Sequence, residues 1–233
     1  MRKLILIENV SNLLNVSFIL ITLVTVAQFY KASNNSESVL IILSTWMLLQ
    51  MVVGLSGFYT HPNTFPPRLV LLAPPAVIFI IILFLTARGK QFIDSLNLKD
   101  LTLLHTIRIF VELVLYGLYL AKAVPKIMTF EGSNFDILAG LSAPLVFYLG
   151  FVKINLTKNT LLLWNAVCLV LLFNIVLLAT FSTPTVIQKF GFEQPNIAIL
   201  YFPFVWLSSV VVPLVLFSHL AAIRQLMKYG SYK

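Results

Sequence analysis

The sequence is poor in charged residues and in cysteine. Asp, Glu, Lys and Arg make up 10% of its 233 residues, whereas soluble domains carry about 25%. Hydrophobic residues make up 59%, more than a soluble core of this length can bury, so the composition excludes an ordinary soluble domain. Cys168 is the only cysteine, which excludes a disulfide within the chain and a CxxC metal site.

Several motifs are also absent. There is no glycine-rich phosphate loop, HExxH or GxSxG, and no evident internal repeat of the kind many transporters carry. The last apolar segment has no lysine in its middle for a retinal Schiff base. The net charge of +8 does not indicate nucleic-acid binding, because the cations lie mostly at the ends of apolar runs.

Long apolar runs without strict alternation favour helices over a β-barrel. We therefore expect an all-α membrane protein, a single domain over residues 1–233 that forms a compact bundle of about seven transmembrane helices. The first run is too long for a signal peptide, and we expect it to be retained. The expected crossings are Leu4–Tyr30, Val39–Tyr59, Leu69–Ala87, Asp100–Lys122, Ile137–Val152, Thr160–Phe181 and Ile197–Ile223.

The distribution of cations predicts the orientation. Under the positive-inside rule, the larger group of basic residues marks the cytoplasmic side. This predicts an amino terminus outside and a carboxyl terminus inside, although Arg2 and Lys3 oppose it. The residues expected on the cytoplasmic side are Arg88, Lys90, Lys99, Lys153, Lys158 and the basic tail.

The segment Asp100–Lys122 carries a polar stripe. At about 100° per residue its members fall within roughly 60° of arc, and the stripe extends about 21 Å along the helix. Ionisable groups at this depth should face the bundle interior. We expect Arg108 and Glu112, one turn apart, to form a buried ion pair near the bilayer midplane. The stripe consists of His105, Arg108, Glu112, Tyr116 and Tyr119.

The stripe predicts a polar pocket within the membrane for a lipid-like or isoprenoid-like small molecule. Arg108 would hold an anionic or carbonyl head group, and Glu112 and His105 are the candidate catalytic residues if the ligand is modified. The sequence leaves open whether the protein is an enzyme. The expected ligand-binding residues are Arg108, Tyr116, Tyr119, Glu8, Asn12, Gln50, Asn174 and Trp206.

Other functions remain open. The protein can be a non-catalytic membrane scaffold or complex subunit with a structural ion pair. His105 and His219 lie at similar depths on different helices and can ligate a b-type haem, and transport of a small solute is a further alternative. We otherwise expect no metal and no cofactor. The expected partners are membrane lipids and a lipid-like small molecule, with no nucleic acid, and protein partners are unknown.

Two stretches resemble a known group of proteins. The stretch from Phe130 to Gly140, FEGSNFDILAG, in which Asn134 or Asp136 is expected to cap the following helix, is similar to one in an uncharacterised family of small bacterial multi-pass membrane proteins. Gln194–Ile197 with Tyr201–Pro203 resembles another part of the same family. The resemblance implies a bacterial inner membrane and supplies no active site.

Overall fold

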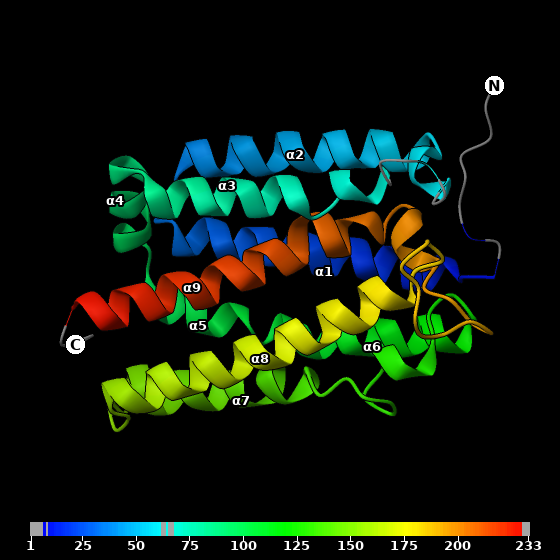
Figure 1. Cartoon of the computed structure of the whole chain (residues 1–233). Coiled ribbons are helices and arrows are strands. Elements are labelled where there is room, and N and C mark those ends of the chain that lie inside the picture. Colours follow the sequence, from blue (N-terminus) through cyan, green and yellow to red (C-terminus); the bar gives the residue numbers. More distant parts are fainter. Residues whose placement is uncertain (1–6, 8, 62–63, 65–67, 230–233) are drawn as a thin grey trace.

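The computed structural model describes residues 7, 9–61, 64 and 68–229. All regular structure in these residues is helical, and most helices run along one common axis (Figure 1). The α-helices are α1 (Asn12–Ala32), α2 (Glu37–Leu55), α3 (Pro74–Leu85), α4 (Ala87–Ser95), α5 (Leu98–Leu104), α6 (Ile107–Leu120), α7 (Ile137–Phe147), α8 (Lys158–Ser182) and α9 (Val212–Lys228). Short 3-10 helices are η1 (Phe58–Thr60), η2 (Arg68–Leu71), η3 (Lys126–Met128) and η5 (Ala198–Leu200), and π-helical turns are η4 (Tyr148–Val152) and η6 (Leu207–Val211).

The all-helical bundle is confirmed, but the count of seven spanning helices is not. Five segments of the described chain are long and apolar enough to cross a membrane: Asn12–Ala32, Glu37–Leu55, Leu98–Leu120, Lys158–Ser182 and Leu207–Lys228. A sixth is reached only if α3 and α4 are taken as one broken span. The expected crossings at residues 69–87 and 137–152 are helical but short: α3 begins only at Pro74, and Ile137–Val152 is below spanning length.

Proline sets the start of α3. Pro74 and Pro75 occupy its first positions, where the missing N–H has no helical partner and the fixed φ suits the helix. The two prolines therefore begin this helix and do not kink it. The residues after the expected crossing, including Arg88 and Lys90, belong to a further helix, α4, which bends 96° from α3. A Cβ on Gly89 would lie 2.3 Å from the carbonyl oxygen of Leu83, so this corner requires glycine.

Two segments form the centre of the bundle. The most apolar 18 residues of Leu207–Lys228 are 67% buried, and those of Leu98–Leu120 are 61% buried. The corresponding shares in the other three candidate spans are 17–28%. α1 packs on α5 and α6, while α9 packs on α5 and α8. The outer helices turn large apolar side chains outward, among them Leu20, Ile41 and Val170. Polar groups carried by α5, α6 and α9 are consequently placed in the interior.

Candidate functional site

Three of the five residues in the polar stripe face inward, as predicted: His105, Arg108 and Glu112 are each 1–2% exposed. The other two, Tyr116 and Tyr119, are half-buried. The segment is interrupted near His105, where Thr106 N–H donates to the carbonyl of Leu103 three residues earlier. α6 begins after this turn and positions Arg108 and Glu112 one turn apart on its buried face.

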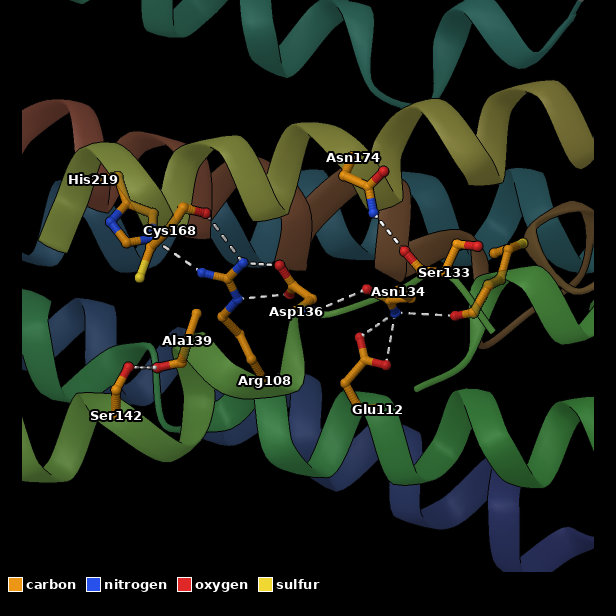
Figure 2. Close-up of polar contacts among 11 residues, drawn as sticks. Arg108, Glu112, Ser133, Asn134, Asp136, Ala139, Ser142, Cys168, Asn174 and His219 are labelled. Atoms are coloured by element: carbon orange, nitrogen blue, oxygen red, sulfur yellow. Dashed lines mark hydrogen bonds and ion pairs between the residues drawn. The ribbon is translucent and has the colours of Figure 1, made fainter. Parts of the chain in front are cut away.

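Arg108 pairs with Asp136, not with Glu112. Its Nε donates to Asp136 Oδ2 at 2.6 Å, and its Nη2 donates to the other carboxylate oxygen (Figure 2). Nη2 also donates to the Cys168 carbonyl on α8 at 3.4 Å. The expected ion pair with Glu112 is wrong, because Asp136 from the loop before α7 meets the guanidinium edge on. That two-point geometry is stronger than an Arg-before-Glu pair within one helix.

The Glu112 carboxylate accepts hydrogen bonds from the side-chain amide of Asn134. Asn134 Nδ2 lies 2.7 Å from both carboxylate oxygens of Glu112 and also donates to the Met128 carbonyl at 3.0 Å. Within the described residues Glu112 makes no ion pair. Asn134 Oδ1 accepts from the Asp136 N–H at 3.0 Å, so the amide links the two carboxylates (Figure 2).

The loop that supplies these partners turns both of their side chains inward. Asn134 is 0% and Asp136 5% exposed. A Cβ on Gly132 would lie 2.2 Å from the Lys126 carbonyl oxygen, so the close approach within the loop requires glycine. Asn174 of α8 donates to the Ser133 carbonyl at 2.8 Å and supports the loop from the other side. Asp136 precedes α7 as expected, but its carboxylate does not cap that helix because it is bound to Arg108.

His219 extends the network on α9. Its Nε2 lies 3.1 Å from Arg108 Nη1, which can only donate, so Nε2 accepts. The ring proton is therefore on Nδ1, which donates to Asn165 Oδ1 at 2.8 Å. This assigns a neutral tautomer of His219 from its two partners.

His105 stacks on His219. The two ring centroids are 3.6 Å apart and the planes differ by 9°. Trp164 lies edge-on to both rings. Neither nitrogen of His105 has a hydrogen-bond partner in the part of the chain that the structure describes, which costs about 1–3 kcal/mol for a buried polar group. Parallel rings at this separation leave no space for a porphyrin between them.

A cavity of about 120 Å³ adjoins the network. Arg108, Glu112 and Asp136 form its polar part, and the remaining lining is almost entirely aliphatic. Small-molecule pockets usually measure about 300–1,000 Å³, so this cavity has room for a head group but not for a whole lipid. Thr180 of α8 lines it and is exposed, while Ser208 of η6 lines it and is half-buried. The cavity therefore extends toward the outer surface between α8 and η6.

The structure gathers some of the predicted residues and separates others. His105, Arg108, Glu112 and His219 come together, although the histidines do not line the cavity. Glu8 lies outside the described residues. Six others lie away from the cavity: Asn12, Gln50, Tyr116, Tyr119, Asn174 and Trp206.

Five of these six residues have contacts elsewhere, among them Asn174, which donates to the Ser133 carbonyl. Asn12 is exposed at the start of α1. Gln50 binds the Tyr59 hydroxyl and the Leu71 carbonyl. Trp206 donates to the Met47 carbonyl at 3.0 Å. Tyr116 packs against Tyr119 and Phe130.

Sequence reasoning did not assign Asn134, Asp136 and Asn165 to the site. The signal for the first two was an Asn and an Asp two residues apart, directly before an apolar run. That pattern is typical of a helix cap and does not reveal a partner 28 residues away. The described residues contain no cluster of three or more His, Cys, Asp or Glu side chains that could hold a metal ion.

Comparison with known proteins places the chain in a family. Residues 65–227 match the model of a domain of unknown function, DUF8737. The chain belongs to this family. Membership assigns no activity, and no curated protein and no solved structure matches the chain. The matched segment of this DUF8737 protein includes Arg108, Glu112, Asp136 and His219.

Proposed function

We propose that this chain is an integral protein of the bacterial inner membrane that binds a lipid-like or isoprenoid-like small molecule in the cavity beside Glu112. The membrane assignment is supported by five helices of spanning length and by the apolar side chains on their outer faces. The bacterial source rests on the resemblance of the FEGSNFDILAG stretch.

The orientation proposed is amino terminus outside and carboxyl terminus inside. Arg224 on α9 binds Asp94 on α4, and Lys31 at the end of α1 binds Asp100 on α5, so these ends lie together. The turn before α8 lies at the same end (Figure 1). The larger group of basic residues lies at this end, as expected for the cytoplasmic side. Its cations are Lys31, Arg88, Lys90, Lys99, Lys153, Lys158, Arg224 and Lys228, against Arg68, Lys122, Lys126 and Lys189 at the other end.

The observation that supports the ligand proposal is the incomplete hydrogen bonding of the Glu112 carboxylate. A carboxylate has about four lone-pair positions, and within the described residues a single amide nitrogen serves both of its oxygens. The same carboxylate lines the cavity. A hydroxyl or amine of a bound molecule would complete its hydrogen bonding, and a buried carboxyl in this position can also exchange a proton with that group.

Arg108 is a weaker candidate for direct ligand contact. Four of its five N–H groups are used by Asp136, His219 and the Cys168 carbonyl. We therefore place the ligand's polar contact on Glu112 and give Arg108 the role of holding Asp136 at the cavity wall. His105 lies behind His219 and has no direct contact with the cavity.

A scaffold role is the second candidate. It is favoured by the near-complete internal pairing of Arg108, which needs no ligand to satisfy its buried charge. In this case the network orients α6, α8, α9 and the loop before α7, and the cavity holds no specific molecule.

Native mass spectrometry in mild detergent separates the two. Val176→Phe fills the cavity from α8, whereas Val170→Phe adds the same side chain at a position 69% exposed on the same helix. Ligand binding predicts a co-purifying species in wild type and in Val170→Phe that is lost in Val176→Phe and Glu112→Leu. An unchanged profile in all four proteins refutes the ligand proposal and favours the scaffold.

A further inference from the structure

A second and larger space lies on the opposite face of η6 and α9. It measures about 600 Å³ and forms a cleft between α2 and α3, with η6 and α9 as its floor. The floor residues are Ser209, Val210, Pro213, Leu214 and Phe217, whereas the cavity beside Glu112 uses Leu207, Ser208, Val211, Val212 and Val215. The two spaces are therefore separated by the helix itself.

α2 and α3 form the two walls of the cleft and make little direct contact with each other. α2 is tied to the floor by Trp46, whose Nε1 donates to the Ser209 carbonyl at 2.8 Å. α3 is held at its far end by the 96° corner into α4. Between them the walls are aliphatic and aromatic, including Ile42, Leu49 and Phe79. A volume of 600 Å³ lies within the range of about 300–1,000 Å³ of small-molecule sites, and its lining suits a hydrocarbon chain.

One end of the cleft is polar. Ser36 and Ser38 line it at the start of α2, and Phe92 lines it from α4. Arg88 precedes Phe92 by four residues and so lies on the same face of α4. Arg88 is exposed and makes no ion pair within the described residues. Lys90 is rotated by about 160° from Phe92 and lies on the other side of the helix.

We propose that this cleft seats an acyl chain of an anionic phospholipid, with the phosphate bound by Arg88 and by the serine hydroxyls of α2. The chain enters between α2 and α3 from the surrounding bilayer. α4 is amphipathic and lies across the end of the bundle (Figure 1), the position in which an interfacial helix would meet lipid head groups. An exposed guanidinium without an ion pair among the described residues, on the face of α4 that lines one end of the apolar cleft, matches an anionic head group on a hydrocarbon chain.

Titration of delipidated full-length protein with dioleoylphosphatidylglycerol or dioleoylphosphatidylcholine, followed by native mass spectrometry, tests the chain-binding part. Ala76→Phe and Thr45→Phe fill the cleft from α3 and α2, and Ile78→Phe is the control on the outer face of α3, 57% exposed. The tightest phosphatidylglycerol adduct should be lost in both cleft variants and kept in the control. Retention of that adduct in both cleft variants overturns the proposal.

The head-group part is tested with a matched pair on α4. Arg88→Gln should weaken phosphatidylglycerol binding about fivefold, the effect of one basic residue near an anionic head group, and leave phosphatidylcholine unchanged. Lys90→Gln removes the same charge from the other side of the helix and should change neither. Equal effects of the two substitutions would show general surface attraction and refute the assignment to Arg88. Glu112→Leu should leave this binding intact, so failure here is distinguishable from failure of the ligand proposal above.

Discussion

Replacing Asp136 by Asn should destabilise the protein much more than replacing Glu112 by Gln, because only Asp136 pairs with Arg108. Asp136→Asn removes the counter-charge from Arg108, which is 2% exposed. Breaking a buried ion pair on one side costs about 3–5 kcal/mol. Glu112→Gln keeps an oxygen that accepts from Asn134, so it should cost about 1 kcal/mol, the value of one hydrogen bond.

Thermal unfolding can be followed through the thiol of Cys168. It is the only cysteine of the chain and is 2% exposed, so a thiol-reactive fluorophore reports unfolding on heating in detergent. At about 2–4 °C per kcal/mol for a chain of this size, Asp136→Asn should lower the apparent Tm by about 6–20 °C and Glu112→Gln by about 2–4 °C. The Arg108 contact to residue 168 involves the backbone carbonyl and does not depend on the thiol.

A double replacement controls for the charge. Arg108→Met with Asp136→Leu removes both ions and substitutes apolar side chains, so it should recover much of the stability lost in Asp136→Asn. Equal losses of Tm in Asp136→Asn and Glu112→Gln would refute the assignment of Asp136 as the partner of Arg108. Failure of the double variant to recover would show that the pair is needed for more than charge balance.

Two further predictions concern the ends of the bundle. Gly132→Ala forces a Cβ against the Lys126 carbonyl oxygen and should lower the Tm measured at Cys168, whereas a tolerated alanine would refute the close approach in that loop. Burial raises the pKa of Asp94, but hydrogen bonds from Lys228 and Arg224 outweigh it and hold the pKa below its usual value. The Asp94 contacts should therefore stabilise the fold fully above about pH 4, the pKa of an unfolded Asp, and less as the pH falls through the lowered value. The Tm difference between wild type and Asp94→Asn should be constant well above about pH 4 and should shrink as the pH is lowered below about 4, and a difference that does not change with pH would contradict this.

The burial of His105, Arg108 and Glu112 could be predicted because it depends only on the sequence of their own segment. Charged residues within an apolar segment of spanning length have to face other protein, and the period of the helix then determines which residues share a face. His105, Arg108 and Glu112 are buried for this reason. The same reasoning gave the approximate positions of α1, α2, α8 and α9, since long apolar runs need no distant partner to be identified.

The partner of Arg108 could not be predicted in this way. Asp136 is 28 residues from Arg108 along the chain, and its approach depends on the path of the loop before α7. The tight fold of that loop at Gly132 has no periodic signal. α4 was not predicted for a similar reason. It has only nine residues, three of them charged, and such a segment resembles a loop unless the tight corner at Gly89 is known.

The ion pair and the cavity are not independent features. Replacing a buried ion pair by apolar residues is often neutral or stabilising, so stability alone does not account for Arg108 and Asp136. Their contact does determine where the loop before α7 lies, and Met128 and Asp136 of that segment line the cavity beside Glu112. A substitution at Asp136 therefore changes stability and cavity shape together and cannot separate scaffold from ligand binding. Glu112 and Val176 line the same cavity without contributing to the ion pair, so ligand profiles of variants at these two positions decide between the two functions.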